Sequence, residues 1–361
     1  MTLFDIIALL LKLVFVLAVV LNAVPVVIWF ERRGSAWMQG RVGPNRVGPF
    51  GLLQPVADVI KFIFKEDFVP KEASKFYYHV APMIAAVAPF AAFAAIPFGS
   101  FLAIGGQQVP LQIASLDIGI LSVLAFAGLE VYPIMLAGWA SNNKYSMFGA
   151  LRGSSQMVSY EIALGLSLVS MLLIYGTLNL TEMVVYQDQL MFGFMPRWGI
   201  FLNPIAFLIF LIAIFAETNR LPFDLPEGDA ELVAGYHTEY GATKFAMFFF
   251  AEYVAMIMAS SLLITLFFGG YALFPGLETV IAGIAGALQL SPEWTQNIRA
   301  AFQVAGFIFK VGCMMFFYVW VRWTFPRFRF DQLMNLGWKI LFPLALVNLL
   351  FVALVIAWMG G

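Results

Sequence analysis

A run of acidic side chains between two apolar segments is the first feature of this chain that could do chemistry. Residues 217–240 read ETNRLPFDLPEGDAELVAGYHTEY and contain one base, Arg220. The acids are Glu217, Asp224, Glu227, Asp229, Glu231 and Glu239. Carboxylates this close together influence each other's pKa values and respond to any charge that arrives nearby. An ordinary solvated loop is the alternative, but the interleaved turn-forming segments LPFDLP and ELVAGY disfavour it.

Ionisable residues also interrupt the apolar segments themselves. They are Glu130, Glu161, Glu217, Glu252 and Lys310. A charge at the centre of a membrane helix costs about 2.5–3.5 kcal/mol even on a lenient scale, so such residues indicate function. We interpret them as a ladder of proton-carrying groups that leads from the acidic loop towards the middle of the membrane. The alternative is a set of structural pairs, for example Lys310 with Glu252.

These groups must be held by membrane-spanning elements, and the composition predicts such elements. Of the 361 residues, 62% are hydrophobic and 11% are charged, and the mean hydropathy is +0.88. Apolar runs of about 18 residues or more indicate transmembrane helices, whereas spanning strands would need short alternating segments. We expect an all-α integral membrane protein that forms one domain, 1–361. The predicted spans are eight: 3–30, 80–98, 117–139, 157–176, 203–217, 245–268, 298–323 and 338–358.

Several classes of site are disfavoured by the residue counts. The one cysteine, Cys313, rules out a disulfide framework and an iron–sulfur cluster held by this chain alone. The two histidines, His79 and His237, lie outside or at the edges of the apolar runs, which disfavours a haem inside the bilayer. We find no phosphate-binding loop, and a net charge of −1 gives no reason to expect nucleic acid. We therefore expect no metal site and no catalytic residue in the isolated chain.

The distribution of basic residues predicts the orientation. Sixteen lysines and arginines lie in or beside the odd-numbered connectors, but the even-numbered connectors hold only Arg197 and Arg299. Basic connectors face the cytoplasm, so both termini are predicted to be periplasmic. The acidic loop, 217–244, is then cytoplasmic.

The first cytoplasmic connector, 31–79, contains two RVGP turns and a helical pattern. Residues 52–66, LLQPVADVIKFIFKE, place apolar side chains at helical spacing. This predicts an amphipathic helix in the plane of the interface, or a helix docked on a partner protein. A helix of this kind beside rigid turns that carry arginines could frame the mouth of a chamber for a lipid-soluble ligand with a polar head.

Four long motifs give the chain a family resemblance. RVGPNRVGPFGLLQP, SNNKYSMFGALRGSSQMVSYE, ETNRLPFDLPEGDAEL and FPRFRFDQLM occur in this order. With them the chain resembles, over nearly its whole length, the family of the H subunit of bacterial NADH:quinone oxidoreductase. This enzyme is respiratory complex I, and its mitochondrial counterpart of this family is subunit 1. The resemblance implies a component of the bacterial inner membrane that forms much of the quinone chamber and links quinone reduction to proton translocation.

The resemblance also implies roles for matching residues. Those implied for the quinone chamber are Arg32, Arg41, Arg220, Asp224, Phe249 and Tyr253. Those implied for the proton path are Glu130, Glu161, Glu217, Glu227, Asp229, Glu231 and Glu252. Arg152, Arg322 and Arg327 match arginines with structural or headgroup roles. Lys310 joins the proton path because of its central place in an apolar run, not through the resemblance.

The implied cofactors and partners belong to an assembly. Quinone is the implied substrate, and electrons would come from FMN and iron–sulfur clusters in peripheral-arm partner subunits. Small membrane subunits and membrane lipid are the other implied neighbours. Two alternatives remain: the related membrane component of a hydrogenase-type or other dehydrogenase complex, and a stand-alone ion transporter. The complete RVGPNRVGP turn favours the quinone enzyme, and two basic cytoplasmic surfaces disfavour a solitary transporter.

Overall fold

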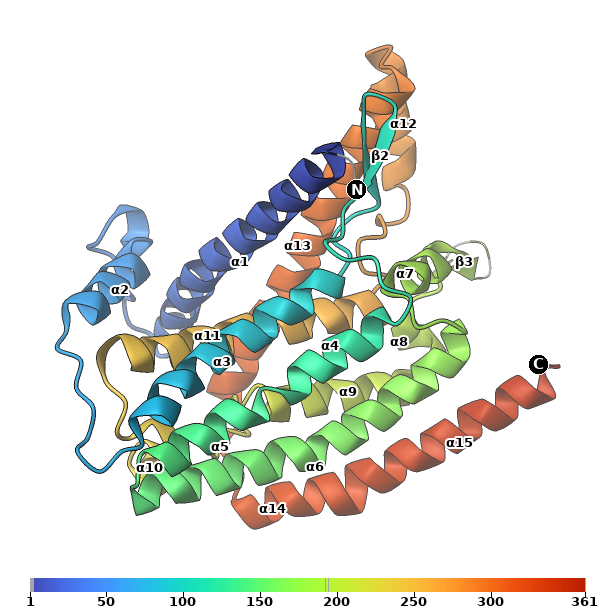
Figure 1. Ribbon diagram of the computed structural model, residues 1–361. Helices are drawn as coiled ribbons and strands as arrows, with labels where there is room; N and C mark the ends of the chain where they lie inside the picture. The colour runs from blue at the N-terminus through green and yellow to red at the C-terminus, as the bar shows by residue number, and fades with distance from the viewer. Residues whose placement is uncertain (1–2, 192, 194, 361) are drawn as a thin grey trace.

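The chain folds as a bundle of long helices with two short hairpins (Figure 1). The computed structural model describes residues 3–191, 193 and 195–360. The helices are α1 (Leu3–Met38), α2 (Gln54–Phe64), α3 (Lys75–Ala92), α4 (Gly119–Gly128), α5 (Val131–Ala140), α6 (Lys144–Tyr175), α7 (Leu180–Asp188), α8 (Gly199–Leu202), α9 (Pro204–Glu217), α10 (Asp229–Leu232), α11 (Ala242–Phe267), α12 (Leu277–Ala287), α13 (Pro292–Thr324), α14 (Phe330–Asn335) and α15 (Phe342–Trp358). The strands are β1 (Phe101–Ile104), β2 (Gln107–Pro110), β3 (Leu190–Met191) and β4 (Met195–Pro196).

The predicted multi-pass helical architecture is confirmed for seven segments of the described chain. Seven segments are long and apolar enough to cross a membrane: Leu3–Met38, Lys75–Ala95, Gly119–Ala140, Lys144–Tyr175, Ala242–Phe267, Pro292–Thr324 and Phe330–Trp358. The remaining predicted span, 203–217, forms α9, whose 14 residues fall short of the roughly 17 that a crossing requires. Asn203 separates α9 from α8 and caps α9, because its Oδ1 accepts a hydrogen bond from the Ala206 amide at 3.0 Å. A crossing made by α8 and α9 together stays a prediction.

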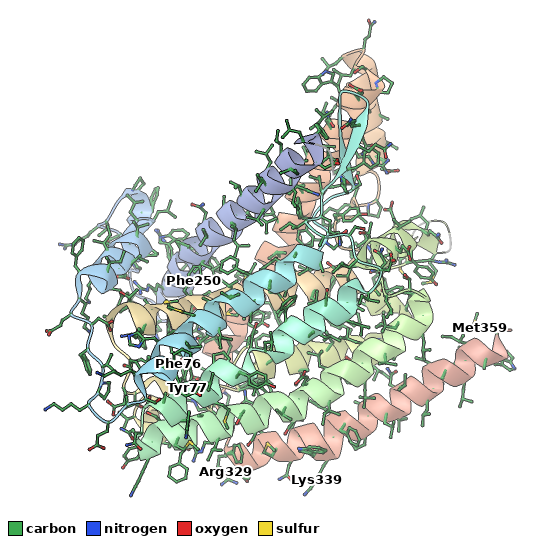
Figure 2. The ribbon with its side chains drawn as sticks, in the orientation of Figure 1. Phe76, Tyr77, Phe250, Arg329, Lys339 and Met359 are labelled. Carbon is green, nitrogen blue, oxygen red and sulfur yellow. The ribbon has the colours of Figure 1, made fainter. Side chains whose placement is uncertain are left out.

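The long helices run between two different ends of the bundle (Figure 1). The loop end carries residues 218–241, α2 and α14, and the far end carries both hairpins, α7 and α12. The first turn of α1 and the last turn of α15 lie at the far end (Figure 1). Arg329 and Lys339 lie at the loop end, and Met359 lies at the far end (Figure 2). This path agrees with an even number of passes; the side of the membrane that each end faces stays a prediction.

Several helices continue past the predicted limits of the apolar spans. The first span was expected to end at residue 30, but α1 continues to Met38. The charged turn that starts at Glu31 stays helical because Glu31 is buried and has partners on two other helices. Similarly, α6 begins at Lys144 and not at 157, where Asn143 Oδ1 caps it by accepting from the Tyr145 amide at 2.8 Å. Hydropathy detects the apolar part of a helix, whereas its end is set by caps and partners.

Helices α6 and α11 form the centre of the bundle. Helix α6 packs against α5, α9 and α15, and α11 packs against α3 and α13. Both bury large side chains completely, among them Tyr160 and Met171 on α6 and Phe267 on α11. Glu252 of α11 is thereby largely enclosed by the bundle, whereas Glu161 of α6 is half-buried.

The predicted amphipathic helix is present as α2, which occupies most of the predicted range 52–66. Its side chains Val59, Ile63 and Phe64 are exposed. On its other side, the Phe62 ring lies 6.0 Å from the Phe245 ring of α11. Helix α2 is thus attached to the bundle on one side only (Figure 1), and its placement at a membrane interface stays a prediction.

Candidate functional site

A buried arginine, Arg220, forms the centre of the candidate site. It follows α9 directly, after a turn in which Asn219 has φ +49°, and it is 6% exposed. Its Nη2 lies 3.3 Å from Oε2 of Glu252 on α11. The guanidinium also lies 4.3 Å from the centre of the Tyr253 ring and 5.8 Å from that of Phe249. A buried cation requires such compensation, and one carboxylate and two rings supply it here.

The contacts continue from Tyr253 to the helices α1 and α13. The Tyr253 hydroxyl donates to Oε2 of Glu31 at 2.8 Å. Oε1 of the same glutamate pairs with Arg322 of α13. One unbroken series of contacts therefore joins Glu252 and Arg220 to Arg322, and it connects four segments of the chain.

A cavity of about 40 Å³, lined by apolar side chains and three carboxylates, lies on the other side of Glu252. Its carboxylates come from three different segments: Glu130 between α4 and α5, Glu217 at the end of α9, and Glu252 on α11. The Tyr236 hydroxyl also lines it and donates to Oε1 of Glu252 at 3.2 Å. Burial raises the pKa of Tyr236 further above its ordinary value, so the phenol stays a donor. A cavity of this size has room for a few water molecules, and the carboxylates and the phenol that line it could bind them.

The break between α4 and α5 places Glu130 at the cavity. Within the described residues, Oε1 of Glu130 is buried without a hydrogen-bond partner, which an enclosed water molecule would satisfy. Glu161 of α6 lies nearby, and a Cβ added to Gly128 would come within 2.9 Å of its Oε1. The predicted intramembrane glutamates Glu130, Glu161, Glu217 and Glu252 are therefore gathered in one region of the bundle.

Asp224 connects the acidic loop to the segment after α13. Its Oδ2 accepts a hydrogen bond from Nη2 of Arg327 at 2.9 Å. Burial and the nearby charge of Glu227 raise the pKa of Asp224 to about 7, against the opposing effect of Arg327. This loop carboxyl therefore titrates near neutral pH.

The other acids of the loop have separate partners. Glu227 Oε1 lies 3.9 Å from Nδ1 of His237, and Glu231 pairs with Arg152 of α6. Oε1 of Glu239 accepts a hydrogen bond from the side-chain Nδ2 of Asn143 at 2.6 Å. The loop also packs closely on α6, because a Cβ on Gly149 would lie 2.6 Å from the Tyr236 amide nitrogen. The side chain of Asp229 lies outside the part of the chain that the structure describes.

Some predicted site residues are not brought to Arg220. Arg32 pairs with Asp58 of α2, and Nε of Arg41 donates to Gln39 at 2.7 Å on an exposed turn. Lys310 lies near the far end, where its Nζ donates to carbonyl oxygens of residues 268, 270 and 272 at 2.9–3.0 Å. The predicted residues Arg220, Asp224, Phe249 and Tyr253, by contrast, lie in or beside the network described above.

Sequence reasoning missed Glu31, Tyr236 and His237 as members of the site. Glu31 was assigned to the first connector because it ends an apolar run. Its position in the turn Glu-Arg-Arg, directly after 28 mainly apolar residues, is the signal that could have drawn attention to it. Tyr236 and His237 stand in the acidic loop itself, in VAGYHTEY. A tyrosine and a histidine among carboxylates are candidates for the same proton chemistry.

Known proteins match this chain over most of its length. The family described as NADH dehydrogenase matches residues 11–353. The H subunit of the NADH-quinone oxidoreductase of Bdellovibrio bacteriovorus is 45% identical, over 96% of this chain and 95% of its own. The corresponding H subunit of Salinibacter ruber is also 45% identical with the same coverage, and NADH-quinone oxidoreductase subunit 8 of Rhodothermus marinus is 45% identical over 92% of each chain.

Proposed function

The chain belongs to the NADH dehydrogenase family, as the membrane-embedded H subunit of an NADH-quinone oxidoreductase, and we propose that it forms part of the quinone chamber and couples quinone reduction to proton movement. Other subunits of the enzyme are its partners. The proposed chamber residues are Arg32, Arg41, Arg220, Asp224, Phe249 and Tyr253. Arg32 and Arg41 would act at its entrance, since Arg32 pairs with Asp58 of α2 from the exposed end of α1 and Arg41 lies on the exposed turn that follows α1.

The observation that carries the proposal is the link between the loop and the cavity. Arg220 holds one oxygen of Glu252, and Tyr236 holds the other. A cavity of about 40 Å³ is too small for a quinone ring but suits water. The cavity is therefore proposed as a stretch of the proton path, while the quinone binds on the loop side of Arg220.

The coupling follows from charge. Reduction of a quinone to a quinol takes up two electrons and two protons, so negative charge or proton demand arises where the headgroup binds. The electrons would come from an iron–sulfur cluster in a partner subunit, which FMN supplies through further clusters. Carboxyls such as Asp224, with a pKa of about 7, respond to such a change by gaining or losing a proton. Arg220 would pass the change to Glu252 and the cavity.

The proposed proton path includes further acids. Glu227, Asp229 and Glu231 belong to its loop part, and Glu130, Glu161 and Glu217 to its buried part. Lys310 would serve at the far end, where Asp188 is the acidic neighbour whose pKa burial raises. The loop end would face the cytoplasm of a bacterial inner membrane, because most of the basic residues lie there.

Replacing Glu217 tests the proposal. Glu217→Gln keeps the shape of the side chain but removes its proton chemistry from the cavity. In the assembled enzyme we expect a loss of most coupled quinone reduction and proton pumping, while NADH oxidation by artificial acceptors is unchanged. Glu278→Gln is the matched control, because Glu278 pairs with Arg299 on an exposed far-end surface. Normal pumping by the Glu217→Gln enzyme would reject the proposed path.

A further inference from the structure

A cage of aromatic rings surrounds Arg33 at the loop end of α1. The Arg33 guanidinium carbon lies 5.5 Å from the centre of the Trp29 ring, 5.9 Å from that of Trp37 and 5.6 Å from that of Phe50. These residues, with Pro49 and Leu52, line an open pocket of about 430 Å³. The spacing of 29, 33 and 37 places the two indoles and the guanidinium on one face of α1.

The turn after the RVGP repeats places the Phe50 ring in this cage. Phe50 has φ +54°, and its carbonyl oxygen accepts from Nη1 of Arg33 at 2.9 Å and from Nε1 of Trp29 at 3.0 Å. Gly51, with φ +76°, passes so close to the Pro44 carbonyl that a Cβ would collide with it. The Phe50 ring is thus held against the guanidinium by two hydrogen bonds and a tight turn.

The charge of Arg33 is not neutralised within the described residues. None of the ion pairs of the described chain involves Arg33, whereas its neighbour Arg32 pairs with Asp58. Its only hydrogen-bond acceptor there is the Phe50 carbonyl. A planar guanidinium with free donors matches the geometry of a phosphate group.

The surroundings of the cage are those of a lipid-facing surface. Trp37 is 63% exposed and Phe50 is 73% exposed. Exposed apolar side chains continue along α1 at Val26 and Leu11, and along α2 at Ile63. Tryptophans beside arginines at the end of a membrane helix are typical of the headgroup level, with acyl chains along the apolar face.

We propose that the Arg33 cage, formed with Trp29, Trp37 and Phe50, binds the phosphate of an anionic phospholipid. The guanidinium would hold the phosphodiester, and the indole N–H of Trp37 would face the headgroup. The acyl chains would run along the exposed faces of α1 and α2. The site is separate from the network around Arg220, so its lipid would anchor α2 and the connector without entering the proton chemistry.

Photolabelling of the assembled enzyme tests this site. The complex is reconstituted in phosphatidylcholine vesicles that contain a photoreactive phosphatidylglycerol, and the label on residues 26–52 is measured by mass spectrometry. A single cation near an anionic headgroup contributes enough for about a fivefold change, so Arg33→Gln is expected to reduce the label about fivefold. Trp37→Leu, which leaves the Phe50 hydrogen bonds in place, is expected to reduce it as well.

Arg46→Gln is the matched control, because Arg46 is an exposed arginine between α1 and α2 that does not line the pocket. The amount of label on residues 26–52 of the Arg46→Gln enzyme is expected to equal that of the unmodified enzyme. Unchanged labelling of Arg33→Gln, or an equal loss in Arg46→Gln, would overturn the proposal. Equal labelling by photoreactive phosphatidylcholine would reject headgroup selection, and competition by inorganic phosphate would indicate a site for free phosphate. Native electrophoresis checks assembly, and Trp37→Leu carries the test if Arg33→Gln fails to assemble.

Discussion

Glu252 is the ion-pair partner of Arg220: its Oε2 lies 3.3 Å from Nη2 of the buried guanidinium. The alternative interpretation paired Glu252 with Lys310, and the structure contradicts it. Lys310 is occupied by the carbonyl oxygens of Phe268, Gly270 and Ala272 beyond the end of α11. The acid in the middle of the bundle is therefore linked to the loop and not to the far end.

This pair predicts different effects for its two members. Arg220→Met leaves Glu252 buried without its counter-charge, which costs about 3–5 kcal/mol, so we expect poor assembly of the enzyme. Glu252→Gln leaves Arg220 facing the rings of Tyr253 and Phe249, so we expect assembly with loss of most coupled quinone reduction and pumping. Native electrophoresis and NADH-driven quinone reductase assays measure the two effects.

The double variant separates a structural from a chemical role. Arg220→Met with Glu252→Gln removes both charges, so assembly should recover relative to Arg220→Met alone while coupled activity stays low. Recovery of full activity in the double variant would mean that the pair serves only to hold α11 and the loop together.

Lys310 is expected to stabilise the far end of α11. Lys310→Met removes an ammonium from three carbonyl oxygens. Each buried acceptor that loses its donor costs about 1–3 kcal/mol, so the thermal stability of the complex should fall. The effect should add to that of Glu252→Gln, because the two residues share no partner. Rescue of Glu252→Gln by Lys310→Met would show a direct coupling that the contacts do not contain.

The sequence predicted the class of fold and the region of the site, because both depend on local pattern. Apolar runs predicted the long helices, and charges within them predicted the buried acids. Glu31 could not be placed in this way, since its partners Tyr253 and Arg322 are 222 and 291 residues away in the chain. Contacts at such separations are set by how helices pack, which hydropathy does not encode.

The first hairpin was missed for a different reason. Gly105 and Gly106 form a two-residue turn between β1 and β2, and both have positive φ. A Gly-Gly pair between strand-forming residues is a known hairpin signal. Hydropathy describes only the long apolar spans, so it carries no information about a short hairpin in a connector between two of them.

Asp224 predicts a pH effect near neutrality. Its pKa is raised from 3.8 to about 7, so the folded loop keeps a proton that an unfolded chain releases near pH 4. The contribution of this group to stability is therefore greatest below about pH 4 and decreases as the pH rises towards about 7. The Asp224→Asn enzyme should lack this decrease in stability. The decrease is measured as a loss of protease resistance of residues 218–241 in the assembled enzyme between about pH 6 and about pH 8.

The control for this experiment is Asp331→Asn, an exposed acid that pairs with Arg329 outside the loop. It should keep the pH dependence of the unmodified enzyme. The loop of the Asp224→Asn enzyme could still lose protease resistance with rising pH, as in the unmodified enzyme. That result would contradict the assignment of this titration to Asp224.

The fit of the acidic loop on α6 depends on Gly149. A Cβ at Gly149 would lie 2.6–2.8 Å from backbone atoms of Gly235 and Tyr236, which cannot yield without moving the loop. Gly149→Ala should therefore displace Tyr236 from Glu252, with reduced coupled quinone reduction and faster proteolysis of the loop.

Gly165→Ala is the matched control on the same helix, because nothing lies within 4 Å of its added Cβ. An alanine inside a helix is favoured over glycine by roughly 0.5–1 kcal/mol, so Gly165→Ala should be as stable as the unmodified enzyme or more so. Full activity of Gly149→Ala would show that the position of the loop backbone on α6 does not govern the Tyr236–Glu252 contact.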